Sequence, residues 1–89
     1  MIRAILFFSG RVQGVGFRFM ANELAKGFVV SGTVENCEDG RVKMVVEAET
    51  DEIDRFVEAI NLSMSGKIKQ IQRFESEPSN EFVKFSVQR

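Results

Sequence analysis

The chain has 89 residues, of which 44% are hydrophobic and 28% are charged. This length and composition are typical of a soluble protein with one small globular domain, residues 1–89. Its 12 Lys and Arg against 13 Asp and Glu give a net charge of −1, which excludes a protein held to nucleic acid or anionic lipid by a strong basic field.

The first predicted elements are a strand and a helix joined by a glycine-rich loop. Residues 2–8 form an apolar run that predicts a buried strand, stopped by Ser9 and Gly10. From Phe17 onward, apolar residues recur with the period of one helix face. Gly27 stands where a left-handed C-terminal cap is expected, so the predicted helix ends there.

The middle of the chain predicts a β-hairpin. Residues 28–35 are rich in β-branched side chains, with a bulge expected at Gly32. Residues 36–40 carry the Asp-Gly signal of a hairpin turn. Residues 41–48 alternate between apolar and other side chains, which predicts a strand with one buried face.

A second helix and two further strands complete the prediction. Thr50 is expected to cap a helix through its hydroxyl group, and residues 62–66 to form the loop after it. Residues 68–75 predict a less regular strand, and residues 82–88 a final strand after a turn. The apolar stripe of the second helix comprises Ile53, Phe56, Val57 and Ile60.

The element order βαββαβ, followed by a short terminal strand, indicates an α+β fold. Two helices with one apolar stripe each must cover one face of a sheet, which gives a two-layer sandwich. This is the ferredoxin-like α/β sandwich, with an antiparallel sheet and both helices on one face. Many unrelated activities use this fold, so the fold alone does not decide the function.

The sequence also indicates where the protein resides. The single cysteine, Cys37, excludes an internal disulfide and is typical of a reducing compartment. The apolar run near the N-terminus has about five residues, fewer than the roughly 7–15 of a signal peptide. No run approaches the ~18 apolar residues of a membrane span. We therefore expect a cytoplasmic protein that does not enter a membrane. We also expect a monomer.

The loop before the first helix has the composition of a phosphate-binding loop. Gly10, Gly14 and Gly16 lie between the strand and the first helical turn, where backbone N–H groups lack partners and the helix dipole is positive. Glycines let these amides converge on an anion, and Arg18 adds a fork that can hold two phosphate oxygens. The other interpretation is a glycine-rich turn beside a surface arginine. The dinucleotide fingerprint is excluded because Phe19 stands where its third glycine is required, and the Walker pattern is excluded because the sequence has no Gly-Lys-Ser/Thr triplet.

Two motifs together resemble those of a known family. The stretch GRVQGVGFR, residues 10–18, resembles the signature of acylphosphatases. A second stretch, GTVEN at residues 32–36 followed by Gly40, resembles the family's second motif. Its Asn36 follows Arg18 by 18 residues, as in that family. The resemblance covers essentially the whole chain; without it, Asn36 before Asp-Gly would be interpreted as a turn residue.

The resemblance implies hydrolysis of a carboxyl–phosphate anhydride to a carboxylate and inorganic phosphate. It implies that Arg18 binds the phosphate and that Asn36 positions the attacking water. It also implies that the substrate is a small acyl phosphate, with no cofactor and no metal, and we expect no nucleic acid partner. The phosphate cradle that it implies consists of the amides of Gln13, Gly14, Val15, Gly16, Phe17 and Arg18.

The composition is compatible with this chemistry. The chain has no histidine and no Cys/His cluster, so no transition-metal site is indicated. An acyl phosphate releases a carboxylate whose conjugate acid has a pKa of about 4, so no proton donor is needed. Stabilisation of the phosphoryl oxygens and placement of one water remain as the tasks of the site.

Departures from the family pattern leave alternatives open. Thr33, Glu35 and Ala48 stand where the family usually has an aromatic, a basic or uncharged residue, and a glycine. We expect Glu35 to face away from Asn36, and Cys37 to take no part in catalysis.

Two other functions are alternatives to acylphosphatase activity. One is a non-catalytic module of the same fold that binds phosphate or carbamoyl phosphate, like the first domain of hydrogenase-maturation carbamoyltransferases. The absence of their further domains favours a stand-alone enzyme. The other, an RNA-binding sheet, is disfavoured because residues 41–48 carry no aromatic side chain.

Overall fold

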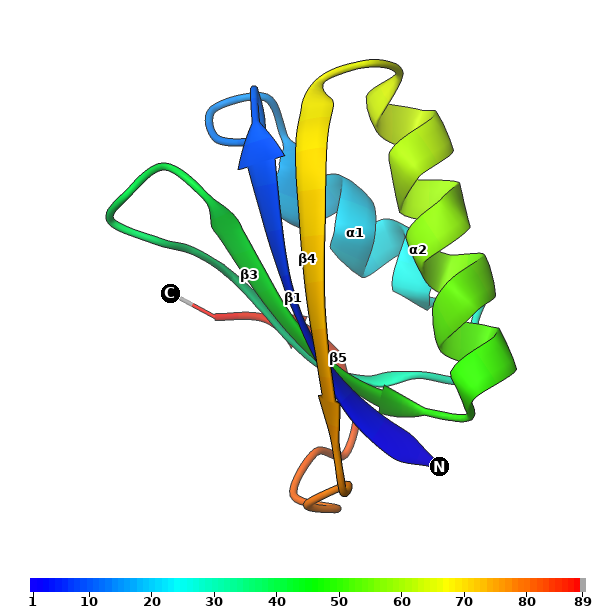
Figure 1. The fold of residues 1–89 in the computed structure, drawn as a ribbon. Helices are drawn as coiled ribbons and strands as arrows, with labels where there is room; N and C mark the ends of the chain where they lie inside the picture. The colour runs from blue at the N-terminus through cyan, green and yellow to red at the C-terminus, as the bar shows by residue number, and fades with distance from the viewer. Residues whose placement is uncertain (89) are drawn as a thin grey trace.

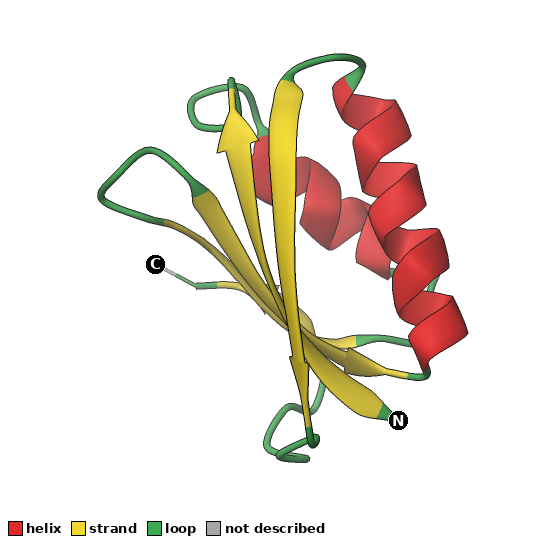
Figure 2. Ribbon diagram, viewed as in Figure 1, coloured by secondary structure: helices red, strands yellow, loops and turns green. Residues whose placement is uncertain are grey.

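The computed structural model describes residues 1–88 as a five-stranded sheet covered by two helices. The strand order is β4-β1-β3-β2-β5, and both helices lie on the same face of the sheet (Figure 2). The predicted α+β, ferredoxin-like arrangement is confirmed. In chain order (Figure 1), the elements are β1 (Ile2–Gly10), α1 (Phe17–Ala25), β2 (Ser31–Asn36), β3 (Val42–Ala48), α2 (Thr50–Met64), β4 (Ile68–Ser76) and β5 (Phe85–Val87).

The core lies between the sheet and the helices. Successive side chains of a strand point to opposite faces, and the helix-facing set includes Leu6 and Phe8 of β1 and Met44 of β3, all fully buried. Phe17 of α1 and Phe56 of α2 close this layer from the other side. The ring centroids of Phe8 and Phe17 are 5.0 Å apart. The start of α1 is therefore packed directly on β1, an inner strand of the sheet.

The edge strand β5 differs from its prediction. Residues 82–88 were expected to form a strand of an antiparallel sheet, but β5 spans only Phe85–Val87 and pairs with β2 in parallel. All other strand pairs are antiparallel, so the sheet is mixed. Val83, an apolar residue of the predicted strand, is 98% exposed. The chain meets the edge of β2 from Lys84 onward, because the carbonyl of Lys84 accepts a hydrogen bond from the N–H of Gly32 at 3.1 Å.

A buried carboxylate holds the segment that leads into β5. Glu47 of β3 is 3% exposed and accepts hydrogen bonds from the backbone N–H of Ser79 (2.7 Å) and Asn80 (2.9 Å) and from the Ser79 hydroxyl (2.8 Å). Arg3 of β1 adds a salt bridge to Glu47 at 2.9 Å and a second to Glu81. Burial raises the pKa of Glu47, but the bonds from Ser79, Asn80 and Arg3 outweigh it and hold the pKa below its ordinary value.

Two predictions for glycines are wrong. Gly27 does not have a left-handed φ; α1 ends at Ala25, and the N–H of Gly27 donates to the carbonyl of Leu24 at 2.9 Å in a continuing right-handed turn. Gly32 is not a bulge, because the pairing of β2 with β3 runs through it without a shift. Its φ of 144° lets the backbone lie against Val45, where a Cβ would overlap the Val45 carbonyl.

The predicted ends of the second helix are also wrong. Thr50 is the first residue of α2, and the preceding Glu49 occupies the N-cap without a capping side chain. Residues 62–66 were expected to form a loop, but the helix continues to Met64, whose buried side chain extends the apolar stripe. Of the predicted apolar stripe, Ile53, Phe56 and Ile60 are buried, and Val57 is partly buried against the core. No helix within residues 1–88 is long and apolar enough to cross a membrane.

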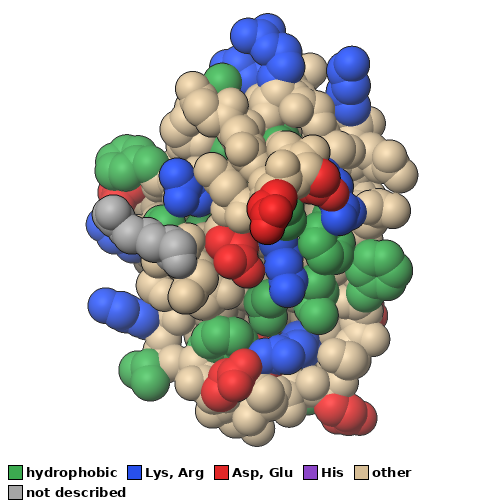
Figure 3. Space-filling view, turned by 90° about the vertical axis from the view of Figure 1, so that its left-hand side faces the viewer, with side chains coloured by type: hydrophobic (Ala, Val, Ile, Leu, Met, Phe, Trp, Pro, Cys, Tyr) green, Lys and Arg blue, Asp and Glu red, His purple; other side chains and the backbone are tan. Residues whose placement is uncertain are grey.

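The face of the sheet away from the helices is mixed in character. Figure 3 looks onto this side of the molecule and shows apolar side chains interspersed with basic and acidic ones. Phe7 and Phe74 pack edge to face with centroids 6.3 Å apart. The guanidinium of Arg41 lies 4.3 Å from the centroid of the Phe7 ring, so it covers this ring from the hairpin side.

Candidate active site

Two glycines shape the loop between β1 and α1. Gly14 (φ 75°) and Gly16 (φ 81°) adopt left-handed backbone conformations, which residues with a Cβ rarely adopt. A Cβ at either position would meet no atom within 4 Å, so glycine is needed for its conformation and not for space. Gly16 is the N-cap of α1, and no side chain among the described residues caps this helix. The N–H groups of its first turn therefore remain available to an anion.

The loop is anchored at both ends. β1 continues through Ser9 and Gly10, beyond its predicted end, with a bulge between them in the pairing with β4. The N–H of Arg11 then donates to the carbonyl of Lys67 at 2.8 Å. Val12 and Phe17 are 1% and 2% exposed, so the apolar core holds the loop on either side of its glycines.

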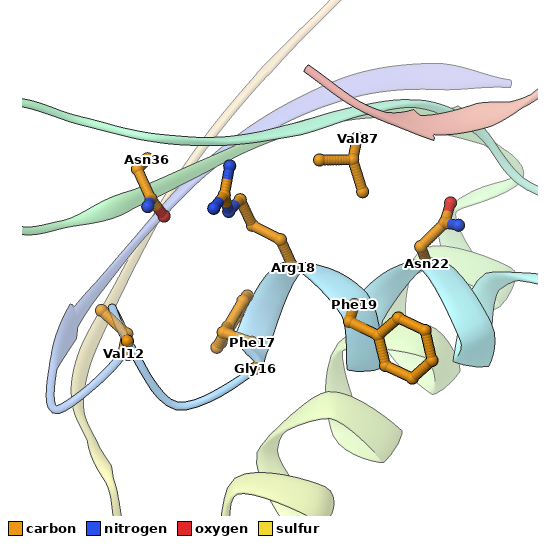
Figure 4. Close-up of a pocket in the computed structure, with 9 residues that line it drawn as sticks. Val12, Gly16, Phe17, Arg18, Phe19, Asn22, Asn36 and Val87 are labelled. Carbon is orange, nitrogen blue, oxygen red and sulfur yellow. The ribbon is translucent and has the colours of Figure 1, made fainter. Parts of the chain in front are cut away.

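Arg18 and Asn36 come from different elements and meet beside this loop. Arg18 is the second residue of α1, and its side chain extends toward Asn36 (Figure 4). Asn36 is the last residue of β2, where it pairs with Val42, so the hairpin turn begins one residue later than predicted. Asn36 shares the helix-facing side of β2 with the buried Val34. Within residues 1–88, Arg18 forms no ion pair, so its N–H groups are open to a ligand.

These residues line one pocket of about 370 Å³. The nine lining residues carry one basic and no acidic side chain, so the positive end of α1 and Arg18 together favour an anion there. Of the predicted site residues, Gln13 and Val15 do not line the pocket. Its lining consists of Val12, Gly14, Gly16, Phe17, Arg18, Phe19, Asn22, Asn36 and Val87.

Four lining residues are absent from the site predicted from the sequence: Val12, Phe19, Asn22 and Val87. Asn22 lies four residues after Arg18, so the helical period alone puts both on one face of α1 and could have indicated it. Val12 lies within the glycine-rich motif but its apolar side chain gave no functional signal. Val87 could not have been found, because it reaches the pocket through the pairing of β5 with β2.

The two residues flanking Asn36 lie outside the pocket. Glu35 is on the opposite face of β2 and pairs across the hairpin with Lys43, as expected from strand alternation. Cys37 is half-buried, and its N–H donates to the carbonyl of Arg41 at 2.8 Å.

The described part of the chain holds no group of three or more His, Cys, Asp and Glu side chains that could bind a metal ion.

Gln13 connects the loop to the hairpin. Its side-chain Nε2 donates to the carbonyl oxygens of Cys37 (2.8 Å) and Arg41 (2.9 Å). Both acceptors flank the turn that follows Asn36. The side chain is thus turned away from the pocket toward the hairpin, while its backbone stays in the loop.

Comparisons with known proteins agree with this fold and site. The sequence model of the acylphosphatase family matches residues 4–87. An acylphosphatase of Listeria monocytogenes serotype 4b is 35% identical over 86 residues, covering 94% of this chain and 92% of that protein. The crystal structure of an acylphosphatase from Bacillus subtilis matches with a TM-score of 0.91 and 33% identity over 100% of both chains. T. kodakarensis HypF matches with a TM-score of 0.84 and 27% identity over 99% of this chain, but over 12% of its own. The chain belongs to the acylphosphatase family.

Proposed function

We propose that the pocket between α1 and β2 is the active site of an acylphosphatase that hydrolyses the carboxyl–phosphate bond of small acyl phosphates. In this proposal, Arg18 and the loop amides hold the phosphoryl group, and Asn36 positions the attacking water. The single observation that carries it is the meeting of Arg18 and Asn36 in one pocket at the uncapped start of α1.

The phosphoryl group is held by fixed positive charge and oriented donors. The left-handed Gly14 and Gly16 keep side chains out of the path of an anion approaching the N-terminus of α1. Arg18 offers two parallel N–H groups to two phosphoryl oxygens. These groups are in position before the substrate binds, so they stabilise the charge of the transition state without reorganising.

Asn36 has the chemistry needed to place a water molecule. Its neutral amide can accept one hydrogen bond from the water and donate another to a phosphoryl oxygen. The water oxygen attacks phosphorus, and the bond to the bridging carboxyl oxygen breaks with its electron pair leaving on the carboxylate. The proton of the water passes to a phosphoryl oxygen of the substrate, and the products are a carboxylate and inorganic phosphate.

The leaving group decides which substrates this site can cleave. A carboxylate leaves without protonation, because its conjugate acid has a pKa of about 4. No titratable acid lines the pocket among the described residues, so a departing alkoxide would receive no proton. Hydrolysis of acyl phosphates in preference to alkyl esters, without a metal ion, follows from the proposal.

Two substitutions separate binding from turnover. Arg18→Ala removes a charge-assisted contact of roughly 1.5–3 kcal/mol; phosphate inhibition should weaken and hydrolysis of acetyl phosphate should be lost. Asn36→Ala should lower kcat by about 10²-fold while the affinity for phosphate remains. Arg55→Ala and Asn61→Ala, both exposed on α2 away from the pocket, serve as matched controls. Full activity of Asn36→Ala would contradict the role given to Asn36.

A second candidate is a module that binds phosphate or carbamoyl phosphate without turning it over. The match to a small part of T. kodakarensis HypF is the observation that favours it. Binding of acetyl phosphate without release of inorganic phosphate would select this candidate.

We further propose that residues 1–89 act as one cytoplasmic, monomeric domain. The mass of the purified protein in solution would test whether it is a monomer.

A further inference from the structure

The side chain of Gln13 has no role in the proposed chemistry, yet it makes two hydrogen bonds at the site's edge. Its carboxamide nitrogen donates to the carbonyl oxygens of Cys37 and Arg41 at 2.8 Å and 2.9 Å, in a partly buried position. These carbonyls stand at the two ends of the hairpin turn, directly after Asn36. We infer that Gln13 is a positioning residue, whose side chain sets where Asn36 lies relative to the phosphate loop. The inference rests on the proposed role of Asn36.

The chemistry of the contact requires a carboxamide. Both acceptors are carbonyl oxygens, and an NH₂ group is the terminus that offers two N–H donors at one nitrogen in a neutral side chain. The carbonyl of Arg41 also accepts the N–H of Cys37 at 2.8 Å. Gln13 thus ties together the two sides of the turn and links both to the loop. A carboxylate or a thioether of the same length offers no donor and would release the turn.

The hydrogen bonds of Gln13 restrain the hairpin turn more than they restrain the loop. The loop already has its own anchors in the buried Val12 and Phe17, whereas the turn residues 38–40 are exposed and project from the sheet (Figure 1). Loss of the Gln13 bonds should therefore displace the end of β2 and leave the loop in place. Asn36 is the pocket residue at that end of β2. Its displacement should therefore impair the positioning of the attacking water.

The expected result is a loss of turnover with little change in phosphate binding. A misplacement of about 1 Å in a positioned group can cost 10²-fold in rate, and we expect kcat to fall about 10- to 100-fold. The Arg18 contacts and the loop amides are unchanged, so inhibition by inorganic phosphate should stay within about twofold of the parent enzyme. A residue that merely stabilised the fold would not separate these two quantities.

The test compares Gln13→Met and Gln13→Glu, which remove the donors with and without adding a charge. Gln70→Met, an exposed glutamine on β4, is the control for the change of side chain. Each protein is assayed for kcat and KM with acetyl phosphate, for inhibition by phosphate and for its thermal midpoint. Parent-like kcat in both Gln13 variants would overturn the inference, and so would a loss of phosphate affinity as large as the loss of kcat.

A double-mutant cycle with Asn36→Ala tests the connection itself. If Gln13 acts through Asn36, then Gln13→Met should lower kcat less than about twofold once Asn36 is already alanine. An undiminished effect would overturn the inference while leaving Asn36 in its role. An Asn36→Ala variant as active as the parent would instead overturn the proposed function of Asn36, which separates the two failures.

Discussion

Replacing Glu47 with glutamine tests how far one buried carboxylate holds the C-terminal segment. Four hydrogen bonds converge on Glu47, from Arg3 and from two backbone N–H groups and a hydroxyl of the segment before β5. Glutamine keeps one acceptor oxygen and turns an NH₂ group toward the remaining donors. Removing one partner of a buried ion pair costs about 3–5 kcal/mol. Because Arg3 is 23% exposed and retains Glu81, we expect the lower end, about 3 kcal/mol.

Urea unfolding measures this loss as a fall in the transition midpoint. Glu49→Gln is the matched control. Glu49 also lies near the end of β3, but its side chain is 74% exposed and within residues 1–88 pairs with the N-terminus alone, so the loss of stability should be under about 0.5 kcal/mol. If Glu47→Gln unfolded at the same urea concentration as Glu49→Gln, the network would contribute nothing measurable and the reasoning would be wrong.

The pH dependence of protein stability gives a second measurement of what the Glu47 carboxylate contributes. The folded-state pKa of Glu47 lies below its ordinary value of 4.5, so the folded state favours the ionised form. Its contribution to stability is therefore fully present above pH 4.5 and is lost as the pH falls through the folded-state pKa. The stability gap between the parent and Glu47→Gln should be constant near neutral pH and narrow in acid. A gap that widened on acidification would contradict this assignment.

Three further outcomes are expected. Hydrolysis of acetyl phosphate should survive an excess of chelator, and an alkyl phosphate should be cleaved far more slowly; activity that needs an added divalent metal would refute the proposed mechanism. Cys37→Ser should retain full kcat, measured by phosphate release, because the thiol has no assigned chemistry, and a folded but inactive variant would show otherwise. Gly16→Ala should destabilise the protein by about 1–2 kcal/mol in urea, because alanine would be held at a left-handed φ; unchanged stability would mean that the loop adopts another conformation.

Regular patterns made most of the fold predictable. In β3, apolar side chains at every second position predicted the buried face correctly, since burial on one face leaves only that register. The resemblance to acylphosphatases implied that Arg18 and Asn36 act in one site, and the structure brings both to one pocket. The alternation also put Glu47 on the outer face, but it could not reveal that Ser79 and Asn80, 32 and 33 residues further along, cover it.

Features that depend on long-range contacts could not be predicted from the sequence. The three residues of β5 carry no pattern that distinguishes parallel from antiparallel pairing, and their partner β2 lies half a chain away. The end of α2 was misjudged because Leu62, which looked like a loop residue, is an exposed position of a continuing helix. Gln13 looked like a member of the phosphate cradle, and only the folded chain reveals the hairpin carbonyls beside its side chain.

The position of β1 inside the sheet, between β4 and β3, has a consequence for biosynthesis. β1 is translated before its partners, because Ile2 pairs with Ala48 and Arg3 with Ser76, so its pairing waits until both partner strands have left the ribosome. Closing such distant contacts is entropically costly and slow, whereas β2 and β3 are adjacent in sequence and can pair early. The nascent chain should therefore organise first around this hairpin and the helices. The anion site, which draws on residues from Val12 to Val87, then assembles only after β5 has left the ribosome.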